Sequence, residues 1–114
     1  MPRSEHIFSK YRGMWIIAMF DLPTKTKKER KRYTKFRKLL LENGFSALQY
    51  SIYARFCASE GVMNRYIATL EQGLPPAGEV RLLMVTDRQF EKMINYVGVE
   101  EVPSENAPRQ LTFF

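Results

Sequence analysis

The sequence MWIIAMFDLP, residues 14–23, places seven apolar residues directly before a carboxylate and a proline. A short run rich in Trp, Ile and Phe, with polar or turn residues at both ends, is typical of a strand buried on both faces. We therefore predict a central strand over residues 14–20. Asp21 follows this strand directly, so the purpose of its carboxylate is the first question that the sequence raises.

The segment after this strand has the pattern of a helix. Its apolar residues recur at helical spacing over residues 26–43, and Gly44 can adopt the left-handed conformation that ends a helix. A threonine, Thr24 or Thr26, can cap the first turn. The predicted inward positions are Tyr33, Phe36, Leu40 and Leu41.

The remaining elements complete an α+β pattern. Residues 45–57 are aromatic and β-branched, which predicts one bent strand or two short strands around Gln49 and Tyr50. The later elements are expected to be a helix over 59–72, a surface turn over 73–78, a strand over 79–86 and a short helix over 87–96, with an irregular tail over 97–109. The inward residues of the second helix are expected to be Val62, Tyr66, Ile67 and Leu70. This order predicts a ferredoxin-like βαββαβ sandwich, with an antiparallel sheet and its helices on one face.

The length of the chain suits one folded domain. A chain of 114 residues, 45% of them hydrophobic, has material for one core but not for two. We assign the domain to residues 14–97, after a polar leader over 1–13 and before a C-terminal tail over 98–114. The tail closes with QLTFF, which is strand-like and too apolar to leave in water. An exposed apolar strand of this kind favours a second copy of the chain, so we predict a homodimer.

Charge and composition limit the classes of function. The net charge is +6 and the pI about 9.6, which favours polyanions such as nucleic acid over metabolites. One cysteine, Cys57, and one histidine, His6, cannot form a disulfide framework or a Cys/His zinc site, and they suit a reducing compartment. Neither a signal peptide nor an apolar run near the ~20 residues of a membrane helix is visible. We therefore expect a cytoplasmic protein with no membrane partner.

Residues 24–38, TKTKKERKRYTKFRK, hold nine of the 18 lysines and arginines. Like charges at three- and four-residue steps repel each other by a few tenths of a kcal/mol per pair on an isolated helix, so an anionic partner would explain the row. The alternative is a solvated helix face that serves only solubility. The predicted nucleic-acid-binding residues are Lys28, Lys31, Arg32, Lys35, Arg37 and Lys38.

This row would hold phosphates without reading base sequence. The sequence has no helix-turn-helix, zinc finger or RNP motif that would read bases. Four aromatic residues are candidates for stacking on bases, although their helix and strand spacing is more typical of a core. They are Tyr50, Tyr53, Phe56 and Tyr66.

Two interpretations of Asp21 stay open. Its oxygens can accept backbone N–H groups in the turn before the first helix, which is a purely structural use. Alternatively, Asp21 is a catalytic ligand of Mg²⁺ or Mn²⁺, which take oxygen ligands and activate water against phosphodiesters. One carboxylate makes a poor metal site, so the second is expected from Asp21 of another copy across a two-fold axis.

The sequence resembles the small CRISPR-associated adaptation nuclease family, the companion of the spacer integrase. The resemblance rests on three segments in this order: MFDLP, KRYTKFRKLLLENGF and LQYSIYARF. The likeness extends over residues 14–97 and is greatest to the form found beside single-protein effector systems. The resemblance implies a ferredoxin-like homodimer whose first-strand aspartates, here Asp21, face each other and support metal-dependent cleavage of RNA or double-stranded DNA. It also implies a terminal strand that extends the partner's sheet, here Gln110, Leu111, Thr112, Phe113 and Phe114.

The sequence departs from the family pattern in two places. The leader over residues 1–13 is not usual, and the acidic residue that often follows the family's serine and aromatic, here Ser51 and Tyr53, is replaced by Ala54 and Arg55. Asp21 is therefore the one carboxylate that the resemblance assigns to the site.

Two main hypotheses follow. In the first, the protein is a homodimeric DNA-binding scaffold that bridges integrase dimers and holds a double-stranded prespacer during spacer acquisition. In the second, it is chiefly a Mg²⁺-dependent endonuclease that cuts DNA or single-stranded RNA. A toxin-like messenger-RNA interferase of the same fold is the further alternative.

Overall fold

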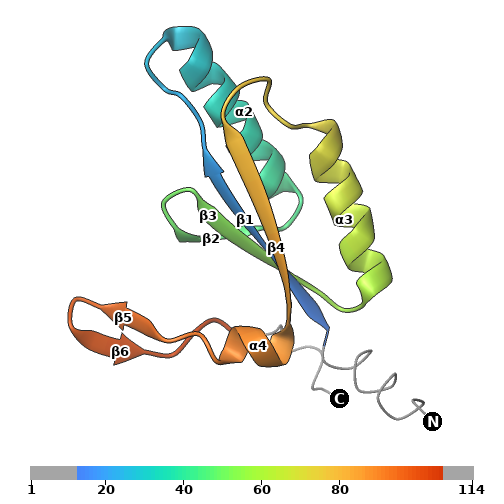
Figure 1. The fold of residues 1–114 in the computed structure, drawn as a ribbon, viewed down its shortest axis with the longest axis vertical. Coiled ribbons are helices and arrows are strands. Elements are labelled where there is room, and N and C mark those ends of the chain that lie inside the picture. Colours follow the sequence, from blue (N-terminus) through green and yellow to red (C-terminus); the bar gives the residue numbers. More distant parts are fainter. Residues whose placement is uncertain (1–12, 107–114) are drawn as a thin grey trace.

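The computed structural model describes residues 13–106, which form a two-layer α+β sandwich with a short appended hairpin (Figure 1). Its sheet has the order β2-β3-β1-β4, with every neighbouring pair antiparallel. This confirms the predicted ferredoxin-like fold. The elements are β1 (Met14–Asp21), α2 (Lys27–Glu42), β2 (Ser46–Gln49), β3 (Ile52–Cys57), α3 (Glu60–Gln72), β4 (Glu79–Thr86), α4 (Asp87–Glu91), β5 (Asn95–Val97) and β6 (Glu100–Val102).

Strand β1 lies between β3 and β4 and is buried on both faces, as its apolar sequence predicts. Alternate residues point to opposite faces. Ile16, Ala18 and Phe20 join the larger core, which α2 and α3 cover. Trp15 belongs to a second, smaller cluster on the other face.

Helix α2 begins and ends where its capping residues predict. The Thr26 hydroxyl accepts from the amide of Glu29, while the Glu29 carboxylate accepts from the amide of Thr26, so the first turn carries a capping box. Gly44 follows the helix with φ of +82°. The inward prediction is wrong for Leu41, which is 43% exposed, because it lies one residue, about 100° of helix rotation, beyond buried Leu40.

The segment 45–57 forms two short strands, β2 and β3, and not one bent strand. The turn between them is the pair Tyr50 and Ser51, since Gln49 pairs with Ile52. Ser51 has φ of +66°, an uncommon conformation for a residue other than glycine.

The sheet face opposite α2 and α3 is covered at one end by α4. Phe90 of α4 stacks on Trp15, with ring centroids 4.0 Å apart, and the Trp15 Nε1–H donates to the Asp87 carboxylate at 2.6 Å. The two long helices therefore share one face, as expected, and the short helix packs on the other (Figure 1).

The prediction for residues 87–109 is wrong in two respects. Helix α4 ends at Glu91 and does not reach Tyr96, and residues 95–102, which span the end of the predicted helix and the start of the predicted irregular tail, form the hairpin β5–β6. Gly98 provides the reason, because its φ of +66° allows a two-residue connection between Val97 and Glu100. Most of the leader and the whole QLTFF strand lie outside the described residues.

Candidate functional site

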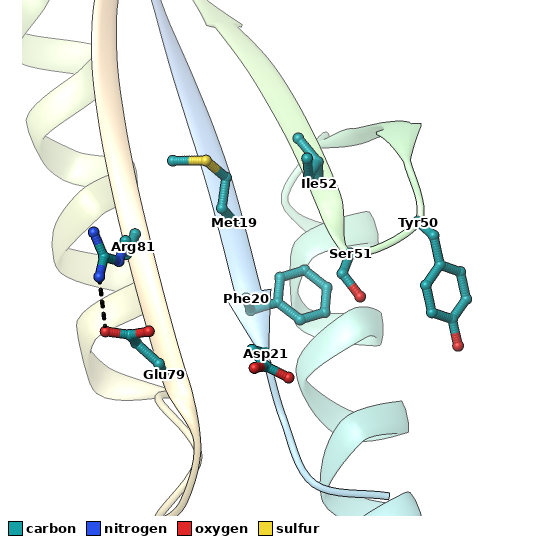
Figure 2. Close-up of a pocket in the computed structure, with 8 residues that line it drawn as sticks. All are labelled: Met19, Phe20, Asp21, Tyr50, Ser51, Ile52, Glu79 and Arg81. Carbon is teal, nitrogen blue, oxygen red and sulfur yellow. Dashed lines mark hydrogen bonds and ion pairs between the residues drawn. The ribbon is translucent and has the colours of Figure 1, made fainter.

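Asp21 occupies the last position of β1, at the edge of a hollow of about 320 Å³ (Figure 2). The antiparallel register places Glu79 of β4 directly beside it, and Arg81 beside Met19. The hollow is lined by Met19, Phe20, Asp21, Tyr50, Ser51, Ile52, Glu79 and Arg81. Its members come from β1, β4, the β2–β3 turn and the first residue of β3.

A close backbone contact fixes this end of β1. Gly78, with φ of +92°, lies directly before β4, and a Cβ atom at this position would be 2.7 Å from the Asp21 carbonyl oxygen. The same Cβ would be 2.7 Å from the side chain of Leu22, which is buried in the core. Only glycine therefore allows this packing without a shift of the chain.

The Asp21 side chain does not serve as the turn acceptor that its structural interpretation requires. Between residues 13 and 106, it is exposed and takes part in none of the hydrogen bonds or ion pairs, and α2 is capped by Thr26 and Glu29 instead. The carboxylate is thus available at the edge of the hollow.

Glu79 gives the same chain a second carboxylate at this position. Its Oε2 lies 3.2 Å from Nη2 of Arg81, so a cation already borders the site (Figure 2). The described residues contain no group of three or more His, Cys, Asp and Glu side chains that would form a complete protein cage. Asp21 and Glu79 supply two carboxylates of the kind that Mg²⁺ or Mn²⁺ take as ligands, and these ions usually keep several water ligands.

Glu79 and Arg81 were not predicted as site residues. Neither belongs to a motif, and their proximity to Asp21 follows from the pairing of β1 with β4. In this topology the start of the last strand lies beside the end of the first. The antiparallel register of the two predicted strands therefore indicates both residues.

The turn at Tyr50 and Ser51 forms the third side of the hollow. The amide of Phe20 donates to the Ser51 carbonyl at 3.1 Å, which ties the turn to the residue before Asp21. Tyr53 and Phe56 are buried and Tyr66 is half-buried, as core residues would be, but Tyr50 is 87% exposed. The assignment of Tyr50 to the core is therefore wrong.

The outer face of α2 bears a second, wider hollow of about 650 Å³, which we call the basic face. Three of the six residues predicted to bind nucleic acid line it: Lys31, Lys35 and Lys38. Lys27, Arg30 and Thr34 complete the lining, and the two cations among these were not in the predicted set. They share the outward side of the helix with Lys31, so helical spacing alone could have found them.

The other three predicted residues lie elsewhere on α2. Lys28 is exposed but lies outside this hollow, and half-buried Arg32 lines a groove against residues 72–76. The Nε–H of Arg37 donates to the Tyr53 hydroxyl at 2.8 Å, so Arg37 is partly engaged in packing.

Acidic neighbours neutralise little of the basic face. In the part of the chain that the structure describes, the one ion pair on this face joins Lys38 to Glu42 at 4.0 Å, between two largely exposed side chains. Exposed pairs of this kind contribute between 0 and about 1 kcal/mol. The face therefore keeps a concentrated positive charge.

Arg55, where the family pattern has an acid, has a packing role. Its guanidinium lies 3.9 Å from the centre of the Tyr66 ring and donates to the Tyr66 hydroxyl, on the helix-covered face of the sheet. Arg55 is therefore not directed into the Asp21 hollow.

Comparison with known proteins identifies the family of this chain. The family model described as CRISPR associated protein Cas2 matches residues 14–93. The chain belongs to the Cas2 family. This confirms the resemblance seen in the sequence.

Several Cas2 relatives match nearly the full length of the chain. A protein of Parvibaculum lavamentivorans named CRISPR-associated endoribonuclease Cas2 is 48% identical over 101 residues, which cover 89% of this chain and all of the relative. Proteins of the same name from Paracidovorax avenae and Flavobacterium psychrophilum are 43% and 42% identical, over 91% and 93% of this chain and 96% and 92% of their own lengths.

No helix among residues 13–106 has the length and apolar composition needed to cross a membrane.

Proposed function

We propose that this Cas2 protein acts in CRISPR spacer acquisition as a homodimer that binds duplex DNA without sequence preference and bridges integrase dimers around a double-stranded prespacer. Membership of a CRISPR-associated family supports a role in spacer acquisition. The observation that carries the binding function is the basic face of α2, where Lys38 is the one lysine with an acidic partner among residues 13–106.

The chemistry of the basic face favours phosphate backbone. Lysine ammonium groups are point charges that bind phosphate oxygens without recognising base edges. Each phosphate that they neutralise releases condensed counterions, so the affinity falls as salt rises.

We further propose a metal-dependent endonuclease activity at the Asp21 hollow. Asp21 and Glu79 are the residues that would hold Mg²⁺ or Mn²⁺, and Asp21 of a second copy would add a further carboxylate. When bound there, the cation would polarise the phosphodiester and activate the attacking water. Arg81, at the same hollow, can bind a phosphate oxygen through its guanidinium and so orient the substrate.

Cleavage of RNA is the second candidate activity. The names of the relatives describe those proteins as endoribonucleases, which favours single-stranded RNA as an additional substrate. The match to a CRISPR-associated family makes a toxin-like messenger-RNA interferase a poorer explanation of the same fold.

The salt dependence of duplex binding tests the role of the basic face. We expect the double variant Lys31→Ala, Lys35→Ala to flatten the slope of log affinity against log salt by up to about two units, since each lysine would meet one phosphate. The matched control is Arg65→Ala with Lys92→Ala, which removes two exposed positive charges from α3 and from the residue that caps α4.

Fluorescence anisotropy with a labelled duplex at several salt concentrations gives both slopes. If the two double variants change the slope equally, the effect comes from net charge alone. An unaltered slope in the Lys31 and Lys35 variant would mean that the face serves only solubility.

A further inference from the structure

Tyr50 contributes little to the core that residues 13–106 form. It is the first residue of the two-residue turn between β2 and β3, where Asn, Asp and Gly are favoured because they tolerate turn conformations. A tyrosine at this position leaves 87% of its surface in water. Large exposed aromatic side chains at the edge of a site are typical of binding.

The position of Tyr50 is nevertheless fixed. Its neighbour Ser51 is tied to β1 through the hydrogen bond from Phe20, and the Tyr33 hydroxyl lies 3.5 Å from the Ser51 hydroxyl. The Tyr33 ring runs nearly parallel to the Tyr50 ring, with centroids 6.5 Å apart and 26° between their planes. Tyr33 itself packs against Phe20 in the core.

The Tyr50 ring is also uncharged at neutral pH. The neighbouring Tyr33 hydroxyl raises the pKa of Tyr50 above its ordinary value of 10.0. A neutral ring, supported on one side by Tyr33 and open to solvent, is suited to stacking.

The geometry points to Tyr50 as a stacking platform for one unpaired nucleobase at the rim of the hollow that Asp21 also lines (Figure 2). The inference rests on the proposed nucleic-acid function and adds a substrate preference, because Tyr50 and Asp21 line the same hollow. Bases inside an intact duplex already stack on each other, so the platform selects single-stranded segments or frayed ends. Every base has a flat aromatic face, so RNA and DNA strands are both accepted.

A fluorescent base analogue tests the platform directly. The probes are short single strands of DNA and of RNA that contain 2-aminopurine, together with a fully paired DNA duplex that carries the same analogue. We expect wild-type protein to quench the single-stranded probes. Tyr50→Ala should lose this quenching and bind both single strands roughly 5- to 150-fold more weakly, with duplex affinity unchanged.

Two further variants separate stacking from other causes. Tyr50→Phe keeps the ring and should keep both quenching and affinity, whereas Tyr50→Leu keeps apolar bulk without an aromatic face and should behave as the alanine variant does. Unchanged single-strand binding and quenching in Tyr50→Ala would overturn the inference. Equal losses for single strands and duplex, or a change in oligomeric state, would overturn it as well, because they would assign Tyr50 to folding or to a subunit interface.

A different experiment tests the proposed function. If Lys31→Ala with Lys35→Ala leaves duplex binding intact, the basic face is not the duplex site, whatever the result for Tyr50. If Tyr50→Ala leaves the single-stranded probes quenched while the lysine variant loses duplex affinity, the platform alone is wrong.

Discussion

At the scale of single residues, the Asp21 carboxylate has no hydrogen-bond or ion-pair partner among residues 13–106, which favours a chemical role over a structural one. A turn acceptor would be hydrogen-bonded to the turn, but the start of α2 is capped by Thr26 and Glu29. Glu79 lies beside Asp21 because Gly78 lets the chain pass against the end of β1. A potential pair of metal ligands is thus built by backbone packing from residues that share no motif.

Removing the charge of Asp21 should abolish cleavage that depends on Mg²⁺ or Mn²⁺. Asp21→Asn keeps the size of the side chain but not its charge, so dimerisation and duplex binding should stay nearly intact. Glu79→Gln should leave cleavage measurable and raise the metal concentration for half-maximal rate by about tenfold, equivalent to about 1.4 kcal/mol of binding free energy.

Cleavage assays on labelled RNA and duplex DNA, run as a titration with each metal, measure both effects. Wild-type rates in Asp21→Asn would contradict the catalytic role. Unfolding of Asp21→Asn in circular dichroism would instead favour a structural one. A metal requirement unchanged in Glu79→Gln would remove Glu79 from the site.

At the scale of elements, α2 combines an inward apolar stripe with an outward basic face. Phe36 and Leu40 are buried in the core, and the capping box fixes where the helix begins. The backbone amide of Thr26, which donates to the Glu29 carboxylate, lowers the pKa of Glu29 below its ordinary value of 4.5. The charged carboxylate therefore stabilises the folded state more than the neutral acid does.

This gives a pH-dependent contribution to stability. Because the pKa of Glu29 is lower in the folded chain, its contribution is present above pH 4.5 and is lost as the pH falls through the lowered value. Glu29→Gln should be less stable than wild type at neutral pH, and the difference should shrink below pH 4.5. Urea unfolding at several pH values measures it, and a difference that stays constant with pH would contradict the capping argument.

The elements differ in how well the sequence predicts them. Strand β1 follows from its continuous apolar run, and both long helices follow from periodicity and caps; all of these signals act over a few residues. The basic face also follows from periodicity. Periodicity does not show which basic side chains of α2 pack elsewhere, because the hydrogen bond from Arg37 to Tyr53 joins two different elements. Glu79 was missed for the same reason, since its relation to Asp21 depends on the pairing of β1 with β4. The hairpin β5–β6 carried the local signal of Gly98, which was overlooked.

At the scale of the whole molecule, several apolar residues of the hairpin region have little to pack against. Ile94, Tyr96, Val97 and Val99 are largely exposed, and the hairpin extends away from the four-stranded sheet (Figure 1). A two-stranded hairpin is marginally stable by itself in water, so a second copy of the chain would stabilise it. This observation adds to the argument for a homodimer.

The oligomeric state should depend on the C-terminal segment. We expect a dimer at micromolar concentration, and deletion of residues 109–114 should weaken the dimer or cause aggregation, because the QLTFF strand would no longer extend the partner's sheet. Light scattering coupled to size exclusion measures this. A wild-type monomer would contradict the homodimer, and a truncated protein that dimerises as before would contradict strand exchange.

We propose that the protein supports spacer acquisition by holding a duplex on the basic face of α2, independently of the Asp21 carboxylate. The most direct measurement is integration of a short labelled duplex by a purified CRISPR-associated integrase, with wild-type protein, Asp21→Asn, Lys31→Ala with Lys35→Ala, or no added protein. We expect integration that requires the protein, proceeds with Asp21→Asn at nearly the wild-type yield and falls sharply with the double lysine variant. Equal integration without the protein, or with the double lysine variant, would contradict it.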